Sequence, residues 1–183
     1  KEFVKDLVKN REIVVVSNRE PYSHEKVGGK TVVKQPASGM VTALEPFMQA
    51  CGGTWIAHGS GTEDKATVDF HHKVSVPVDS PKYTLKRVWL TDKEIKGYYQ
   101  GFSNEGIWPL CHNAHTRPIF RKNDWEEYVR VNEKFAESVL HEIKHKKNPI
   151  VFVQDFHFAL LPKLIRKARK DAIICIFWHI PWP

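Results

Sequence analysis

The sequence of 183 residues contains few cysteines and no long hydrophobic run. Its three cysteines, Cys51, Cys111 and Cys175, lie far apart and include no C-x-x-C pair, which argues against a disulfide framework and is typical of reduced thiols. The apolar runs are far shorter than the roughly 20 residues that span a membrane, and the polar start, KEFVKDLVKN, has no signal-peptide pattern. Because the first residue is Lys1, we expect that an upstream start has been trimmed. These absences predict a cytoplasmic protein without a membrane partner.

Acidic residues are fewer than basic ones, 21 against 28, which gives a formal net charge of +7. Such a charge attracts anions, whether nucleic acids, nucleotides or phosphorylated metabolites. The basic residues cluster in HKKN and KLIRKARK, but no zinc-finger spacing or ribonucleoprotein motif accompanies them. We therefore interpret them as solvated helix faces and expect no nucleic-acid partner. A composition of 42% hydrophobic and 27% charged residues predicts a packed core.

Apolar strands alternate with helical segments along the chain, without internal repeats. Strands are predicted over 13–16, in TWIAHGSG before its glycine-rich turn, around 74–78, in YTLKRVWL, over 150–153 and over 172–177. A helix is predicted to start near Ser38 and to end before Gly52-Gly53, with a kink or a restart at Pro46. Further helices are predicted from the capping box Thr91–Glu94, over 124–146 and over 158–170, and residues 20–36 are predicted to be a loop. This order predicts right-handed parallel crossovers and an α/β layered fold.

The segment HEIKH matches the H-E-x-x-H pattern in which two histidines one helical turn apart bind zinc. The apolar face of this predicted helix is centred near Trp125, Asn132 and Ile143. At about 100° per residue, His141 and His145 therefore point to the solvent side. A catalytic zinc site needs a buried cleft and a third ligand. We interpret the match as chance and expect no metal.

Polar and titratable residues follow four predicted strands at the points where the strands end. These ends read Ser17-Asn18-Arg19, His58-Gly59-Ser60, Asp155-x-His157 and His179. In an open parallel sheet the carboxyl ends of the strands share one edge, where ligands bind. A helix cap would explain a single residue such as Asp155, but it does not explain four polar strand ends. The sequence therefore predicts a binding site at this edge.

Several residues indicate the class of ligand. Arg19 can bind a phosphate or carboxylate through its bidentate guanidinium. The segment ASGM opens a helix whose N-terminus favours anions, and Gly39 lets a ligand approach the backbone. Tyr99 and Trp108 supply aromatic surface for a sugar or a base, although core packing is a rival explanation for Trp108. These features favour a phosphorylated, polar, ring-bearing ligand without selecting a reaction.

Seven segments, in order along the chain, resemble the N-terminal part of trehalose-6-phosphate synthases. They are VVVSNREPY, ASGMVTALEP, GGTWIAHGSG, YYQGFSNEGIWPLCH, WEEYVRVNEKFAE, VFVQDFHFALLP and FWHIPWP. The resemblance implies an α/β fold with a Rossmann-like parallel sheet flanked by helices, the first of two such domains that face a cleft. Residues 1–183 would then be an incomplete, N-terminal acceptor-binding domain, from which the nucleotide-sugar-binding domain is absent.

This family transfers glucose, with retention, from a nucleotide sugar, usually UDP-glucose, to glucose 6-phosphate. Matching motif by motif, Arg19 in SNR corresponds to the arginine that binds the acceptor phosphate. Tyr99 and Trp108 match the aromatic pair that lines the acceptor pocket, and Asp155 in QDFH matches the aspartate that holds acceptor hydroxyls. The resemblance thus implies glucose 6-phosphate as the acceptor and trehalose 6-phosphate as the product.

On the donor side, the resemblance implies that Gly39 lies near the diphosphate and that His179 in HIPWP contacts the donor sugar. Asp155 and His179 are therefore the predicted catalytic residues, whereas His157 fits a structural role equally well. In the family, the acceptor hydroxyl attacks the face that the nucleotide leaves, and the departing phosphate helps to take its proton. Catalysis then consists of positioning and electrostatic stabilisation, without a metal or other cofactor.

Two departures from the family pattern lie near the donor and the loop. Ser38-Gly39 replaces a glycine pair, and His58 stands where many members have tryptophan. The donor nucleotide and the exact acceptor therefore stay open. Alternatives are an enzyme that makes glucosylglycerol phosphate and a non-catalytic sugar-phosphate-binding homologue. We expect this chain alone to be inactive, and its unpaired strand edges make a homo-oligomer an option.

Overall fold

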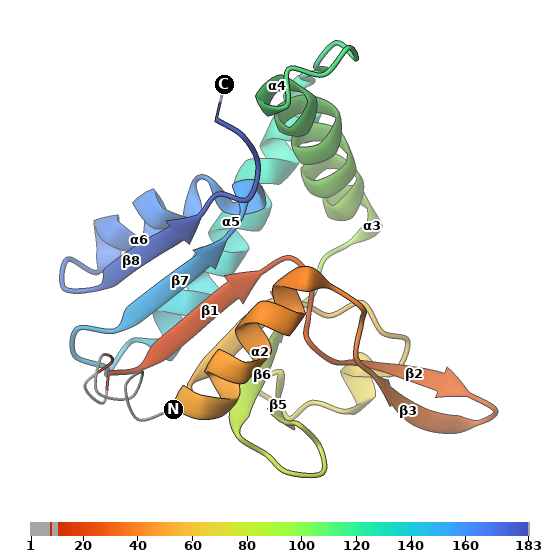
Figure 1. The fold of residues 1–183 in the computed structure, drawn as a ribbon, viewed down its shortest axis with the longest axis vertical. Helices are drawn as coiled ribbons and strands as arrows, with labels where there is room; N and C mark the ends of the chain where they lie inside the picture. Colours follow the sequence, from red (N-terminus) through yellow and green to blue (C-terminus); the bar gives the residue numbers. More distant parts are fainter. Residues whose placement is uncertain (1–7, 9–10, 183) are drawn as a thin grey trace.

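The computed structural model describes residue 8 and residues 11–182 (Figure 1). Its strands are β1 (Ile13–Ser17), β2 (Ser23–Val27), β3 (Lys30–Lys34), β4 (Thr54–His58), β5 (Lys73–Val76), β6 (Tyr83–Val88), β7 (Ile150–Gln154) and β8 (Ile173–Phe177). Its longer helices are α2 (Gly39–Cys51), α5 (Lys122–Glu142) and α6 (Leu161–Ala168). The short helices α3 (Asp92–Glu94) and α4 (Trp108–Cys111) flank a π-helical stretch, η2 (Ile95–Ile107), and η1 (Asp64–Ala66) and η3 (Phe156–Phe158) are 3₁₀ turns.

The described strands form a six-stranded sheet in the order β5-β6-β4-β1-β7-β8 and a separate hairpin, β2–β3. Within the sheet, β5 runs antiparallel to β6, and the other neighbours are parallel. In the central strand, Val15 pairs with Trp55 of β4 on one side and with Phe152 of β7 on the other. The parallel strands follow the Rossmann order, so the direction of winding reverses between β1 and β7. The predicted α/β fold is confirmed.

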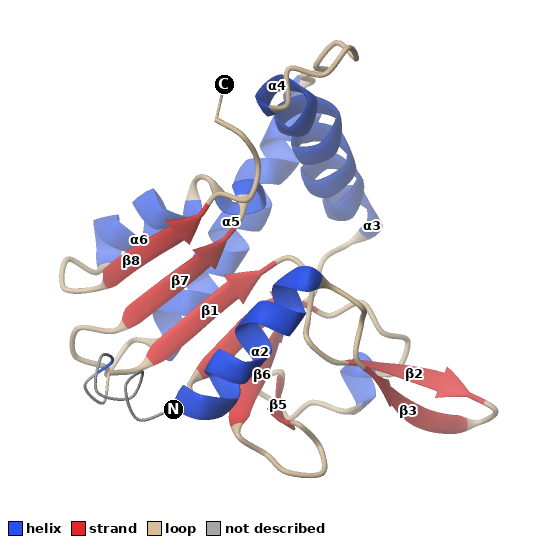
Figure 2. Cartoon of the chain, viewed as in Figure 1, coloured by secondary structure: helices blue, strands red, loops and turns tan. Residues whose placement is uncertain are grey.

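Helices cover both faces of the centre of the sheet (Figure 2). Successive side chains of β1 point to opposite faces, so each set packs against a different group of helices. Val14 and Val16 pack into a core with residues of η2, α5 and α6. Ile13 and Val15 pack into a second core, which includes Met48 of α2. Every residue of β1 is therefore buried, which explains why the strand is a continuous apolar run rather than an alternating one.

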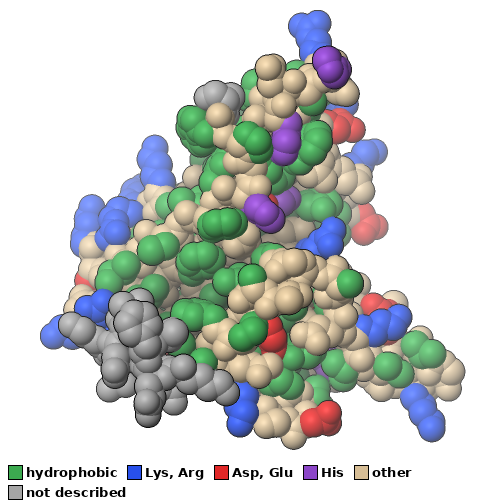
Figure 3. All heavy atoms as spheres, viewed as in Figure 1, with side chains coloured by type: hydrophobic (Ala, Val, Ile, Leu, Met, Phe, Trp, Pro, Cys, Tyr) green, Lys and Arg blue, Asp and Glu red, His purple; other side chains and the backbone are tan. Residues whose placement is uncertain are grey.

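The β7–β8 end of the sheet is less well covered on the side of α2. Phe177 of β8 is 49% exposed and Ile173 is 39% exposed. Phe152 and Phe177 line an apolar cavity of about 400 Å³ together with Leu44 of α2. Figure 3 shows hydrophobic side chains gathered on this face of the molecule. The β7–β8 end of the sheet is thus more exposed than the central strand β1.

The prediction that residues 20–36 form a loop was wrong, because this segment contains the hairpin β2–β3. Its strand sequences are SHEKV and KTVVK, and β3 is exposed throughout, so the hairpin lacks the alternating pattern of a half-buried strand. Gly28 and Gly29 have φ angles of 57° and 79°, the two positive values that a type I′ hairpin turn requires. The glycine pair was the only local sign of the turn.

The helix predictions need small corrections. The helix α2 continues through Pro46 without a break, α5 ends at Glu142, earlier than predicted, and the helix predicted over 158–170 is confined to α6. The capping box is confirmed, because Thr91 Oγ1 accepts a hydrogen bond from the Glu94 N–H and the Glu94 carboxylate accepts one from the Thr91 N–H. None of the described helices is apolar over a stretch long enough to cross a membrane.

The HEIKH segment lies at the C-terminal end of α5. His141 and His145 are exposed, as the helical period predicts. Between them, the buried Glu142 side chain forms ion pairs of 2.8 Å with Lys73 and with Lys86. Burial acts in the opposite direction, but these two ammonium groups lower the pKa of Glu142 to about 2. The glutamate therefore ties α5 to β5 and β6.

Candidate functional site

The carboxyl ends of β1, β4, β7 and β8 lie along one edge of the sheet, as the sequence predicted (Figure 1). Two pockets open on this edge, and both are lined by Asn18, Arg19 and Tyr99. We name them after the acidic residue that lines only one of them. The Asp155 pocket has a volume of about 260 Å³, and the Glu20 pocket has a volume of about 460 Å³. They lie where the winding of the sheet reverses, the usual ligand site of such folds.

The Asp155 pocket brings together all but one of the predicted site residues. Its walls include Arg19, Gly39, Tyr99, Asp155 and His179, together with Ser38, Met40, Gln154 and His157. These residues come from the ends of β1, β7 and β8, from the start of α2 and from η2, so distant parts of the sequence converge. The exception is Trp108, which is 43% exposed, stacks on His112 with 4.0 Å between ring centroids, and lines neither pocket.

Asp155 has a strained backbone at the end of β7. Its φ of 77° and ψ of 170° fall in a region that is populated almost only by glycine, and such conformations cluster at functional sites. Its Oδ1 atom accepts hydrogen bonds from the Phe156 N–H at 2.8 Å and from the His179 N–H at 3.1 Å. The carboxylate therefore joins the ends of β7 and β8, and Oδ2 makes no hydrogen bond to any residue in the described part of the chain.

His157 supports the aromatic side of this pocket. Its ring stacks on Tyr99, with centroids 5.3 Å apart and an angle of 17° between the planes, and on Phe156 at 4.1 Å. Burial lowers the pKa of His157 to about 4; Asp155 opposes this shift and the positive charge of Arg19 adds to it. The imidazole is therefore neutral at pH 7, and it positions the Tyr99 ring without carrying a charge.

The N-terminal end of α2 forms the opposite side of the Asp155 pocket. Ser38 is its N-cap residue in an extended conformation, but the Ser38 side chain does not cap the helix. Apart from its own helix backbone and chain neighbours, no described residue lies within 4 Å of the position that a Cβ atom on Gly39 would take. Ser38, Gly39 and Met40 line the pocket, so the start of α2 borders it, and a helix N-terminus suits an anionic group.

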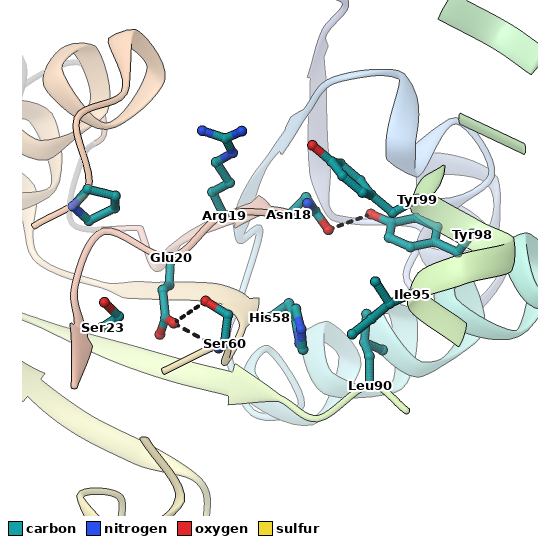
Figure 4. Close-up of a pocket in the computed structure, with 11 residues that line it drawn as sticks. Asn18, Arg19, Glu20, Ser23, His58, Ser60, Leu90, Ile95, Tyr98 and Tyr99 are labelled. Atoms are coloured by element: carbon teal, nitrogen blue, oxygen red, sulfur yellow. Dashed lines mark hydrogen bonds between the residues drawn. The ribbon is translucent and has the colours of Figure 1, made fainter. Parts of the chain in front are cut away.

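The Glu20 pocket lies between the ends of β1 and β4 and the start of η2. Figure 4 shows that the neighbouring side chains of Arg19 and Glu20 point to opposite sides of the loop after β1. The buried Tyr98 hydroxyl donates a hydrogen bond of 3.2 Å to Asn18 Oδ1, which links η2 to the same loop. Glu20 accepts hydrogen bonds from both the N–H and the hydroxyl of Ser60, at 2.9 and 3.1 Å.

Behind this pocket lies a group of buried charges that we call the Arg87 cluster: Glu20, His24, Asp64 and Arg87. Arg87 binds Glu20 Oε2 and Asp64 Oδ1, each at 2.8 Å. It also donates to His24 Nδ1 at 2.8 Å, so that nitrogen carries no proton. Burial, with the neighbouring Asp64 adding to it, raises the pKa of Glu20 to about 7. The cluster fixes β2, η1 and β6 behind the site.

Two residues of the Glu20 pocket escaped the sequence analysis. Glu20 follows Arg19 directly in SNREPY, and the available signal was a second charged residue at a strand end. Tyr98 precedes Tyr99, but the helical period does not distinguish which of two adjacent tyrosines faces a ligand and which is buried. The burial of Arg87 was not predicted either, because an arginine inside a strand is usually expected to face solvent.

Comparison with known proteins identifies relatives along almost the whole chain. The profile of glycosyltransferase family 20 matches residues 11–183. The trehalose-6-phosphate synthases of Mycobacterium tuberculosis and Mycolicibacterium vanbaalenii are each 37% identical to it over 173 residues, which cover 94% of this chain. The same match covers only 34% of either relative, so the chain spans about a third of their length.

Solved structures show the same fold. A structure described as "Trehalose-6-phosphate from E. coli bound with UDP-2-fluoro glucose" superposes with a TM-score of 0.70 at 26% identity, over 94% of this chain and 34% of that one. An alpha,alpha-trehalose-phosphate synthase (UDP-forming) from Burkholderia vietnamiensis also superposes with a TM-score of 0.70, at 23% identity, over 94% of this chain and 33% of that one. The second likeness shows the fold alone.

Proposed function

Because this chain belongs to glycosyltransferase family 20, we propose that it is the N-terminal, acceptor-binding part of a retaining glucosyltransferase. The proposed reaction transfers glucose from UDP-glucose to glucose 6-phosphate and yields trehalose 6-phosphate. The names of the mycobacterial relatives support this product, and the UDP-2-fluoro glucose on the E. coli protein supports the donor. The nucleotide-binding domain would be supplied by the remaining two thirds of a protein of the relatives' length.

The observation that carries the proposal is the position of Arg19. Its side chain is exposed, lines both pockets and is paired with no carboxylate in the described part of the chain. An unpaired guanidinium at the reversal point of the sheet is suited to a phosphate, which it can bind through two parallel hydrogen bonds. Tyr99 and Asp155 in the same pocket would then contact the sugar ring of the phosphorylated acceptor.

In the proposed reaction, the Asp155 pocket holds the reacting ends of the two substrates. Asp155 Oδ2 would accept a hydrogen bond from an acceptor hydroxyl and orient it toward the anomeric carbon of the donor. The donor diphosphate would face Gly39 and the N–H groups at the start of α2, which stabilise the charge that develops as it departs. The departing phosphate oxygen would take the proton from the attacking hydroxyl, and His179 would contact the donor sugar.

Calorimetry with glucose 6-phosphate tests the acceptor site. We expect saturable binding to this chain, and Arg19→Ala should weaken it about 10- to 100-fold, the usual effect of losing a charge-assisted pair. Plain glucose should bind too weakly to measure, because it lacks the phosphate. Arg117→Ala, at an exposed position outside both pockets, is the matched control. Equal affinity of the wild type and Arg19→Ala would contradict the proposal.

A further inference from the structure

The helix α2 has a single charged residue, and that residue is buried. Glu45 is 5% exposed and lies on the same face of the helix as the buried residues Val41 and Met48. Its carboxylate forms no ion pair with any residue that the structure describes. A buried carboxylate without a cation usually costs free energy, because it loses its hydration, and an apolar residue would avoid this cost. The glutamate therefore needs another explanation.

Two buried tyrosines take the place of a cation. The Tyr22 hydroxyl donates a hydrogen bond to Glu45 Oε1 and the Tyr83 hydroxyl donates one to Oε2, each at 2.5 Å. Burial raises the pKa of both tyrosine hydroxyls, and the hydrogen bond to Glu45 and its charge add to this, so each hydroxyl keeps its proton. Both carboxylate oxygens therefore have a donor. We call Glu45, Tyr22 and Tyr83 the Glu45 bridge.

The Glu45 bridge joins α2 to two other parts of the fold. Tyr83 is the first residue of β6, and its ring stacks on Trp55 of β4 with 6.1 Å between the centroids. Tyr22 lies in the loop after β1, and its carbonyl oxygen accepts a hydrogen bond of 3.1 Å from Arg87 Nη2. The same loop begins with Asn18 and Arg19, which line both pockets. One buried carboxylate thus connects the Arg19 loop, α2 and β6.

The two elements that Glu45 connects meet again at the Asp155 pocket, where Arg19 and Gly39 are both lining residues. Gly39 lies six residues before Glu45 in the same helix. At 1.5 Å per residue this is about 9 Å along the helix axis, so a shift or rotation of α2 at Glu45 also moves its N-terminus. The position of the carboxylate therefore affects how far the start of α2 lies from the Arg19 loop.

We propose that Glu45 is a positioning residue that holds the N-terminus of α2 at a fixed spacing from Arg19, so that the Asp155 pocket receives two anionic groups at once. Apolar side chains could bury the same face of α2, but two directional hydrogen bonds also fix the rotation of the helix and its position along its axis. The inference rests on the proposed function, in which Arg19 binds the acceptor phosphate and the start of α2 faces the donor diphosphate. Glu45 itself lines neither pocket.

A sugar with two phosphates measures this spacing. Glucose 1,6-bisphosphate offers one phosphate to Arg19 and one to the start of α2, whereas glucose 6-phosphate offers only the first. By calorimetry we expect the wild type to bind the bisphosphate about five-fold more tightly, the usual effect of an anion at a helix N-terminus. The triple variant Tyr22→Phe, Glu45→Leu, Tyr83→Phe should bind the two ligands equally. A five-fold gain that persists in the variant, or no gain in the wild type, would overturn the proposal.

The triple variant changes position without leaving a buried polar group unpaired. It removes the carboxylate together with both hydroxyls, and such joint replacements are often nearly neutral for stability, which urea denaturation checks. Glu45→Gln can still accept one hydrogen bond and donate another, so it should restore most of the gain. Glu137→Leu, at an exposed position of α5, loses the same negative charge and should keep the five-fold gain.

NMR of the ¹⁵N-labelled chain tests the position of α2 without a ligand and without the triple variant. Tyr83→Phe frees α2 from β6, and Tyr22→Phe frees it from the Arg19 loop. In both variants we expect the amide signal of Gly39 to shift, whereas the signals of α6 should stay in place. An unchanged Gly39 signal in both would overturn the proposal. If Gly39 shifts but the wild type does not bind glucose 6-phosphate, then Glu45 positions α2 and the proposed acceptor site fails.

Discussion

The two sides of the crevice are built in opposite ways. On the β4–β6 side, the Arg87 cluster places a guanidinium among two carboxylates and an imidazole, and each of these side chains is at most 4% exposed. On the β7–β8 side, the Asp155 carboxylate accepts one hydrogen bond from the His179 N–H, and β8 is largely exposed. On the first side the buried charges pair with one another, whereas on the second Asp155 Oδ2 accepts no hydrogen bond from the described residues and Phe177 is 49% exposed. The difference shows that buried ion pairs close the first side, whereas the second side keeps exposed surface beside the Asp155 pocket.

The largest expected effect on stability concerns the β4–β6 side, where the Arg87 cluster lies. Arg87→Met removes the cation that pairs with Glu20 and Asp64, so both buried carboxylates would lose this ion-pair partner. Breaking a buried ion pair in this way typically costs about 3–5 kcal/mol, and urea denaturation of the variant should show a loss of that size. Arg130→Met is the control, because Arg130 is 52% exposed and pairs with Glu127 on the same helix. It should lose less than about 1 kcal/mol of stability. Equal losses in the two variants would show that the buried cluster stabilises the fold no more than an exposed ion pair does.

On the open side, the backbone of Asp155 is strained. Two substitutions can separate the effect of this strain on stability from the effect of losing the side-chain hydrogen bonds. Asp155→Gly and Asp155→Ala both lose the carboxylate, but only glycine fits a φ of 77° and a ψ of 170° without strain. We expect the alanine variant to be less stable than the glycine variant by about 1–3 kcal/mol. Thermal and urea unfolding of the pair measure this difference directly. Equal stability would show that the backbone relaxes at this position.

The two sides should also respond to pH in opposite directions. His157 has a pKa of about 4 in the folded chain against 6.5 for the free side chain, so its contribution to stability is complete above pH 6.5 and is lost as the pH falls toward 4. Glu20 has a pKa of about 7 against 4.5, so its contribution is complete below pH 4.5 and is lost as the pH rises toward 7. Each slope is at most about 1.4 kcal/mol per pH unit.

Two variants divide this pH dependence between the sides. His157→Phe keeps a ring between Tyr99 and Phe156 but cannot titrate, so the loss of stability from pH 6.5 to pH 4 should become smaller. Glu20→Gln should remove the loss between pH 4.5 and pH 7. The free energy of unfolding measured over this range in both variants and in the wild type gives the result. If a variant keeps the wild-type pH profile of stability, then the substituted residue does not cause that part of the pH dependence.

The closed half of the sheet was easier to predict than the site. Hydrophobic runs predicted β1, which is buried on both faces, and β7, and polar residues at the ends of these strands predicted the edge at which the pockets open. The hairpin β2–β3 was missed because β3 is exposed throughout and His24 is the one fully buried residue of β2, so neither strand shows an apolar period. Burial of Arg87 depends on Glu20 in the loop after β1, on His24 of β2 and on Asp64 of η1, all distant in sequence, which no local pattern reveals.

The smallest expected effect on stability concerns Tyr99 and Trp108. The family resemblance predicted them to be a pair in one pocket, but the structure places them apart. Tyr99 is half-buried and stacked on His157 inside the crevice, whereas Trp108 lies at the far end of η2 and contacts His112. We expect Tyr99→Ala to cost about 1 kcal/mol of stability through the lost aromatic contact. Trp108→Ala should change it by less than about 0.5 kcal/mol, as exposed substitutions usually do. If Trp108→Ala nevertheless weakens glucose 6-phosphate binding as strongly as Tyr99→Ala, then η2 must move toward the crevice when the acceptor binds, and the open side closes only around its ligand.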